Sequence, residues 1–129
     1  MGWAMPDEDL VTRLAADPQL RRQSEALNAA KANSDVISRI RWAYMVLEQE
    51  ECRKQGYRAL RDFRYIRNGV SHPELMKPCD KAYFQKELSV DFPDLANPAH
   101  LKFLKQKSVD ILGEAVRIVE GRLADHRFW

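Results

Sequence analysis

The side chains best suited to chemistry lie in one short segment, Arg67-Asn68-Gly69-Val70-Ser71-His72. An arginine stays charged at every physiological pH, whereas a histidine gains or loses a proton near neutrality. Such a pair suits phosphate esters, because the histidine can move a proton while the arginine holds the charge that builds on the phosphoryl oxygens. Arg67 and His72 are therefore the candidate catalytic residues.

The local sequence must bring these two side chains together. On one regular helix, positions 67 and 72 would point ~140° apart. Gly69 permits backbone angles that other residues avoid, and Pro73 disfavours the α conformation for His72. We therefore expect the helix to fade at Asn68-Gly69 and the chain to turn, so that the imidazole approaches the guanidinium. The alternative is an arginine that merely suits a helix C-terminus, followed by an ordinary loop histidine.

Basic residues precede this segment. Positions 53–67 carry six of them against one acid, Asp62: Arg53, Lys54, Arg58, Arg61, Arg64 and Arg67. Neighbours at i,i+3 share a helix face, and tyrosines are interleaved among them. A positive face with aromatics suits a phosphate backbone and unstacked bases. The predicted RNA-binding residues are Arg58, Arg61, Arg64 and Tyr65. Alternatively, this face is solvated and balanced by acids on neighbouring helices, such as Glu48, Glu50 and Glu51.

An arginine, then Asn, then a histidine five residues after the arginine resembles the Rx4H signature of HEPN domains. The resemblance implies an all-α bundle that dimerises and cuts RNA without a metal or other cofactor. It implies His72 as general base or acid, Arg67 as phosphate clamp and Asn68 as the residue that orients them. The products would be a 2′,3′-cyclic phosphate and a 5′-hydroxyl. Each chain offers one motif histidine, whereas the reaction needs both a base and an acid. We therefore expect a homodimer with a composite active site.

One position departs from a toxin branch of the family, which carries a tyrosine two residues after the histidine. Here that position is Glu74, so regulation through modification of that tyrosine is not expected. A toxin of another branch, a phage-defence protein or a stand-alone stress ribonuclease fits better, and an antitoxin or other partner protein is left open. Two alternatives stand beside this: a non-catalytic HEPN-like module for RNA or nucleotide binding or dimerisation, and a plain helical scaffold.

The elements that must position the segment are helices in an up-and-down, HEPN-like bundle. Residues 1–129 are expected to form one domain, with a core at about 18–125 and a short N-terminal helix at 7–16. Apolar periodicity, prolines and Gly56 predict helices at 7–16, 18–32, 36–54, 57–66, 81–88 and 98–125. Whether Asn33-Ser34-Asp35 separates two helices or lies within one long helix stays open at this point.

Composition narrows the classes further. The 129 residues are 45% hydrophobic and 31% charged, and no apolar run approaches the ~20 residues that span a bilayer. No signal peptide is recognisable, so a cytoplasmic protein that does not bind membranes is expected. Cys52 and Cys79 are expected to be free, buried or half-buried thiols, and no metal-ligand spacing is present. His100 is expected at the surface or in a cap, and His126 at a helix end.

Overall fold

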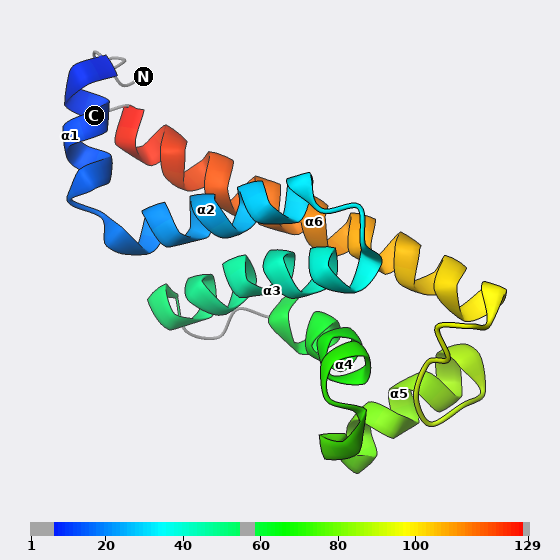
Figure 1. Cartoon of the computed structure of the whole chain (residues 1–129). Coiled ribbons are helices and arrows are strands. Elements are labelled where there is room, and N and C mark those ends of the chain that lie inside the picture. Colours follow the sequence, from blue (N-terminus) through cyan, green and yellow to red (C-terminus); the bar gives the residue numbers. More distant parts are fainter. Residues whose placement is uncertain (1–6, 55–58, 128–129) are drawn as a thin grey trace.

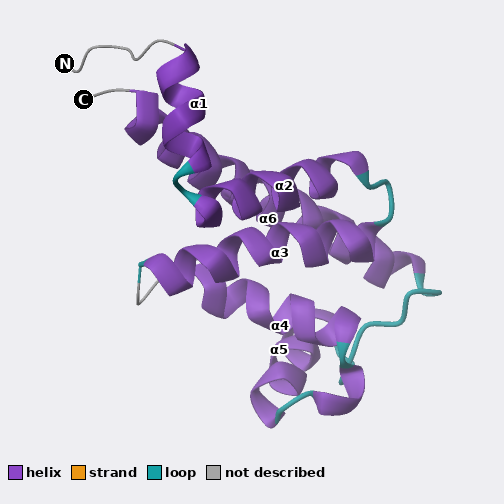
Figure 2. Ribbon diagram, turned by 60° about the vertical axis from the view of Figure 1, so that its left-hand side comes forward, coloured by secondary structure: helices purple, strands orange, loops and turns teal. Residues whose placement is uncertain are grey.

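In a computed structural model, the chain is described for residues 7–54 and 59–127, and its side chains for residues 11–54 and 63–126. Every regular element within these ranges is a helix (Figure 2), which confirms the all-α class. The α-helices are α1 (Asp7–Ala15), α2 (Pro18–Ala32), α3 (Val36–Arg53), α4 (Ala59–Ser71), α5 (Pro78–Leu88) and α6 (Pro98–Arg127), with a 3-10 turn η1 (Pro73–Leu75) between α4 and α5. None of the described helices is long and apolar enough to cross a membrane.

Aspartate caps define the starts of α2 and α3. The carboxylate of Asp17 accepts a hydrogen bond from the backbone N–H of Leu20 at 3.0 Å, and Pro18 occupies the first turn. Likewise Asp35 accepts from the backbone N–H of Ser38 at 2.9 Å. The segment 33–35 therefore separates two helices, which decides the question that the sequence left open.

Helix α3 lies at the centre of the fold and packs against α2, α4 and α6 (Figure 1). Its apolar positions recur at spacings of three and four, so one stripe of the helix is buried. Fully buried side chains from α2, α3 and α6 fill the space between these helices: Ala30, Ile40, Leu47, Leu104, Ile111 and Ala115. This core fixes the position of α3, on whose other side α4 lies.

Helices α4 and α5 form a smaller layer, in which α4 packs against α3 and α5 packs against α4 (Figures 1 and 2). Ile66 of α4 and Phe84 of α5 are fully buried and join the same hydrophobic core. Helix α5 begins at Pro78, three residues before the predicted short helix at 81–88, because Pro78 is well suited to the first position of a helix. The C-terminal end of α4 is thereby held between α3 and α5.

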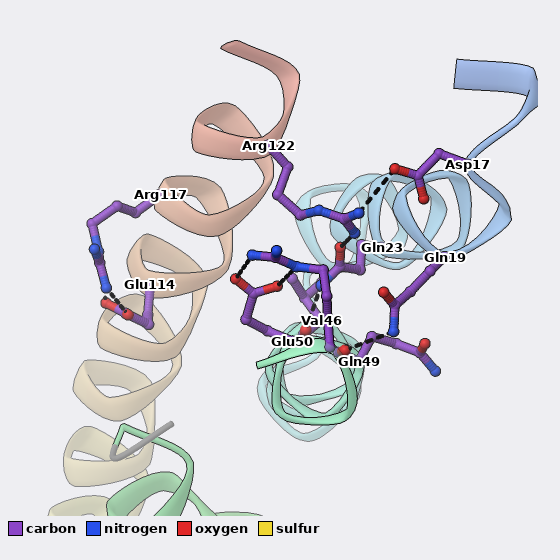
Figure 3. Close-up of polar contacts among 10 residues, drawn as sticks. Asp17, Gln19, Gln23, Val46, Gln49, Glu50, Glu114, Arg117 and Arg122 are labelled. Carbon is purple, nitrogen blue, oxygen red and sulfur yellow. Dashed lines mark hydrogen bonds and ion pairs between the residues drawn. The ribbon is translucent and has the colours of Figure 1, made fainter. Parts of the chain in front are cut away.

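Polar side chains tie α6 to the start of α2 (Figure 3). Nη2 of Arg122 donates to the carboxylate of Asp17 at 2.9 Å, and Nη1 donates to Oε1 of Gln23 at 2.6 Å. The amide of Gln23 in turn donates to the carbonyl of Val46 in α3 at 3.1 Å. Because Gln23 is fully buried, these bonds satisfy polar atoms that would otherwise be costly to bury.

Candidate active site

A surface cavity of about 340 Å³ lies between α3 and the C-terminal end of α4, and both Arg67 and His72 line it. Its lining is completed by residues of α3 and the last turn of α4: Arg41, Tyr44, Met45, Glu48 and Ser71. Two of the three predicted catalytic residues thus border one open space. The third, Asn68, lies behind Arg67 and is bonded to it, as described below.

The chain leaves the helix at His72. The N–H of His72 still donates to the carbonyl of Asn68 at 2.9 Å, as in a regular helix. Its own backbone has φ −142° and ψ 61°, outside the α region, and Pro73 then begins η1. Because the following proline disfavours the α conformation, this is the position at which the chain turns. The predicted effect of Pro73 on the path of the chain is therefore present.

The predicted role of Gly69 is wrong. Helix α4 does not fade at Asn68-Gly69 but continues to Ser71, and Gly69 is a buried helical residue. A Cβ atom at this position would overlap the ring of Phe84 and would lie 3.3 Å from Cδ of Pro93. Glycine is needed here because α4 and α5 approach closely, not because the backbone must take an unusual conformation.

The guanidinium of Arg67 is held on three sides. Its Cζ atom lies 4.7 Å from the centre of the Tyr44 ring, a cation–π contact. Nε donates to Oδ1 of Asn68 at 3.0 Å, and Nη1 is 3.8 Å from Oε1 of Glu48. The Arg67 side chain is 28% exposed, so one part of it is still accessible to a ligand. The planar group is thus held in one orientation.

Asp80 supports this arrangement from α5, and it is a site residue that sequence reasoning missed. The amide nitrogen of Asn68 lies 3.4 Å from each carboxylate oxygen of Asp80, and it donates to them. One of those oxygens also accepts the backbone N–H of Lys77 at 2.9 Å. Asp80 is only 2% exposed, so these bonds compensate a buried charge. The sequence offers one signal for Asp80, an acidic residue in the first turn after Pro78. That signal predicts a helix cap and not a hydrogen bond to Asn68 on α4.

Tyr44 provides the surface on which Arg67 lies. Burial raises the pKa of Tyr44 to about 12, although the positive charges of Arg67 and Arg64 oppose that rise. The phenol is therefore neutral at physiological pH and cannot serve as a base there. The ring of Tyr44 is buried in the core and also supports the guanidinium of the candidate catalytic arginine.

His72 is the most open member of the site. Its side chain is 56% exposed, and Nδ1 lies 3.9 Å from Oε1 of Glu74. Such an exposed pair contributes little to stability. Glu74, which stands where the toxin branch carries a tyrosine, thus lies next to the imidazole.

Of the predicted RNA-binding residues, Arg64 and Tyr65 are the two whose side chains the structure describes, and they have different surroundings. Arg64 is exposed and close enough to Tyr44 for its charge to affect that pKa, so it lies on the side of Arg67. The ring of Tyr65 instead stacks on Tyr83 of α5, with centroids 5.2 Å apart. Arg61 belongs to α4 by its backbone, but its side chain lies outside the described residues, as does the whole of Arg58.

The acids that could neutralise the basic segment are in part engaged with it. Glu50 forms two hydrogen bonds with Arg53, at 2.9 and 2.7 Å, and Glu48 lies near Arg67. No ion pair of Arg64 is found among the described residues, and its side chain is exposed. Among the described side chains, the basic segment is therefore neutralised at Arg53, whereas Arg64 has no ion-pair partner there.

The other two histidines do not line the cavity and have structural roles. His100 is buried, contrary to the prediction, because its Nδ1 accepts the backbone N–H of Asp94 at 2.9 Å and braces the loop before α6. His126 is at a helix end as predicted, and its Nε2 lies 2.9 Å from Oδ2 of Asp17.

Cys52 and Cys79 are free as predicted, but both are exposed. In the described part of the chain, no group of three or more His, Cys, Asp or Glu side chains could hold a metal ion.

Comparison with known protein families, with curated proteins and with solved structures finds no match to this chain. The cavity itself therefore carries the functional inference. It presents an oriented guanidinium, an exposed imidazole and a second arginine around one open space. This set of groups can bind a phosphodiester and move a proton beside it.

Proposed function

We propose that the chain is a metal-independent endoribonuclease of the HEPN type, with α2, α3, α4 and α6 as its up-and-down bundle. One observation carries the proposal: Arg67 and His72, the two ends of the Rx4H motif, line the same open cavity. Asn68, the motif residue that follows Arg67, also supports the proposal, because its side chain accepts a hydrogen bond from the Arg67 guanidinium. A nuclease that acts on cellular RNA works in the cytoplasm, which is the location we propose.

The reaction is a transesterification. The ribose 2′-oxygen forms a bond to phosphorus while the bond from phosphorus to the 5′-oxygen breaks. A base accepts the proton of the 2′-hydroxyl, and an acid gives a proton to the departing 5′-oxygen, which leaves a 2′,3′-cyclic phosphate and a 5′-hydroxyl. In this scheme His72 moves protons, and Arg67 stabilises the charge on the two non-bridging oxygens.

A second copy of the chain supplies the other proton-transfer group. One exposed apolar side chain lines the cavity and two others follow its lining residues closely in the sequence, which supports a covered rather than an open rim. Met45, which lines the cavity, is 42% exposed, and Leu75 in η1 just after His72 is 72% exposed. Trp42 on α3 is 38% exposed. Apolar surface of this kind around a site marks an interface, and a two-fold axis beside it would bring two motif histidines together.

The direct test uses purified protein, an RNA substrate and EDTA. We expect fragments that end in 2′,3′-cyclic phosphates, and at least a 100-fold loss of rate (an order-of-magnitude expectation) in Arg67→Ala and His72→Ala. Arg22→Ala, at an exposed position on α2, is the matched control and should cleave normally. Full activity in both site variants would remove the proposal. In cells, a toxic or defensive nuclease should slow growth on expression, and His72→Ala should relieve this.

The alternative is a HEPN-like module that binds RNA or nucleotides, or dimerises, without cleaving. The position of Glu48 favours it, because a carboxylate 3.8 Å from Arg67 competes with a phosphate for the guanidinium. This alternative predicts salt-sensitive RNA binding that Arg64→Ala weakens, with no cyclic phosphate formed. A partner such as an antitoxin would then be sought as a protein that blocks the cavity rim.

A further inference from the structure

Arg41 of α3 reaches across to the end of α4. Its Nε donates to Oγ of Ser71 at 2.9 Å, at an exposed position, and both residues line the cavity that Arg67 and His72 share. Arg41 lies 26 positions before Arg67 in the chain, so the motif gives no hint of it. Only the packing of α4 on α3 brings this second guanidinium to the site.

The charge of Arg41 is not committed to an acid. No carboxylate of the described residues forms an ion pair with it, and its single hydrogen-bond partner there is Ser71. Asp35 is close enough to sense the charge, but hydrogen bonds from Ser38 are the main cause of its lowered pKa. Arg53 differs, since Glu50 binds it at 2.7 and 2.9 Å. Within the side chains that the structure describes, 11–54 and 63–126, Arg41 is therefore a cation without an acidic ion-pair partner.

The contact with Ser71 also prepares Arg41 for an anion. A guanidinium has five N–H donors, and the bond from Nε uses one of them, which leaves the two Nη groups for a ligand. The Ser71 hydroxyl accepts from Nε and keeps its own O–H as a donor. The Nη groups of Arg41 and the hydroxyl of Ser71 are thus held side by side at the cavity edge. Because they already contact each other, a phosphate that binds there loses less conformational entropy in ordering them.

We propose that Arg41 and Ser71 form a second phosphate-binding position, which binds the phosphate adjacent to the one held by Arg67. This inference rests on the proposed nuclease function and deepens it. The substrate class that follows is an oligoribonucleotide with at least two consecutive phosphodiesters. A dinucleoside monophosphate, which has a single phosphate, would occupy only the Arg67 position and would bind and react poorly.

The test separates binding from cleavage by using strands that cannot react. Oligonucleotides with 2′-O-methyl groups lack the attacking hydroxyl, and lengths of two, three and four residues carry one, two and three phosphates. Their affinities are measured by competition against a longer labelled strand. The second phosphate should tighten binding to the wild-type protein by about tenfold, the value of one good charge-assisted contact. The third phosphate should add much less.

Variants assign that step to Arg41. Arg41→Ala should abolish the gain from the second phosphate and lower the slope of log affinity against log salt by about 0.7. Arg41→Lys should keep part of the gain, Arg67→Ala should weaken all lengths alike, and Arg22→Ala should change nothing. If Arg41→Ala melts at a much lower temperature, Ser71→Ala replaces it, because alanine suits the last turn of a helix.

The result that overturns the subsite is a wild-type protein without the second-phosphate step, including one that binds no strand at all, or an Arg41→Ala protein that retains it. Cleavage of unmodified RNA is scored separately. A protein that shows the second-phosphate step but no cleavage would keep the subsite and remove the nuclease proposal. A protein that cleaves RNA but lacks the step would keep the nuclease proposal and remove the subsite.

Discussion

The side-chain amide of Asn68 donates to the carboxylate of Asp80, with both oxygens at 3.4 Å, and its carbonyl accepts from Nε of Arg67 at 3.0 Å. Asn68 thus links a buried carboxylate on α5 to the guanidinium in the cavity. An asparagine can do this because it offers a donor and an acceptor on one planar group. The motif residue between Arg67 and His72 therefore has a physical task in this fold, which is to fix the orientation of its arginine.

The first prediction concerns Asp80. Asp80→Ala removes the acceptor of both the Asn68 amide and the Lys77 N–H, so we expect a loss of about 1–3 kcal/mol in the free energy of unfolding. Cleavage should fall as well, because Arg67 loses its support. Urea unfolding and an RNA cleavage assay measure the two effects. Asp110→Ala, at an exposed position on α6, serves as control. A folded Asp80→Ala protein with wild-type cleavage would contradict a positioning role.

The second prediction compares two glycines within helices. Gly69→Ala should destabilise the fold by about 1–3 kcal/mol, because the added methyl meets the fully buried ring of Phe84. Gly113→Ala has open space around the new Cβ and should stabilise the protein by up to about 1 kcal/mol through helix propensity. Thermal or urea unfolding of both variants decides the matter. Equal effects of the two substitutions would show that α4 and α5 are not in close contact at Gly69.

The third prediction concerns pH. The hydrogen bonds from Arg53 lower the pKa of Glu50 below its ordinary 4.5, outweighing burial, which raises it. A lowered pKa in the folded state means that Glu50 stabilises the fold above about pH 4.5, and that this contribution is lost as the pH falls through the lowered value. Glu50→Gln should therefore cost on the order of 1 kcal/mol at neutral pH and much less in acid.

Urea midpoints at about pH 7 and about pH 3 measure this difference. The control is Glu87→Gln, because Glu87 is exposed on α5 and is not part of this ion pair. It should leave the midpoint unchanged at both values. A Glu50→Gln penalty that is as large in acid as at neutral pH would mean that the loss comes from packing rather than from the carboxylate charge.

The fourth prediction concerns the proposed homodimer. Leu75→Glu adds a charge to the apolar rim of the cavity, and burying that charge in an interface would be costly. We expect a monomer in analytical ultracentrifugation and a cleavage rate at least tenfold lower, with unfolding unchanged, because Leu75 is 72% exposed. Val109→Glu alters another exposed apolar residue, which lies on α6 and is 56% exposed, and this variant should remain dimeric. A wild-type protein that is monomeric at micromolar concentration would contradict the composite site.

Most helices could be predicted from the sequence because their signals are local. Pro18 and Pro98 mark starts at which the structure begins α2 and α6, and apolar spacing marks the buried stripe of α3. The role of Asp35 could not be decided, since the same residues can cap a helix or lie on its polar face. Gly69 was misjudged because a glycine in a helix can report a close neighbour, and that neighbour, Phe84, is 15 positions away.

The site was only partly predictable for the same reason. The Rx4H motif identified Arg67 and His72, and both line the cavity. Arg41 and Asp80 come from α3 and α5, and nothing in their local sequence shows which helix they will face. His100 was expected at the surface or in a cap, but its buried contact with Asp94 depends on how the loop before α6 folds. Residues recruited by packing between helices cannot be found by periodicity alone.

The two ends of the described chain meet, because α1 packs beside the last turns of α6 and Arg13 donates to the carbonyl of His126 at 3.1 Å. In both ribbon views they lie on the side of the molecule away from α5 (Figures 1 and 2). A fluorescent protein or purification tag fused at either terminus would therefore project from that side. A circular permutant that links the two termini should likewise leave the candidate site between α3 and α4 in place.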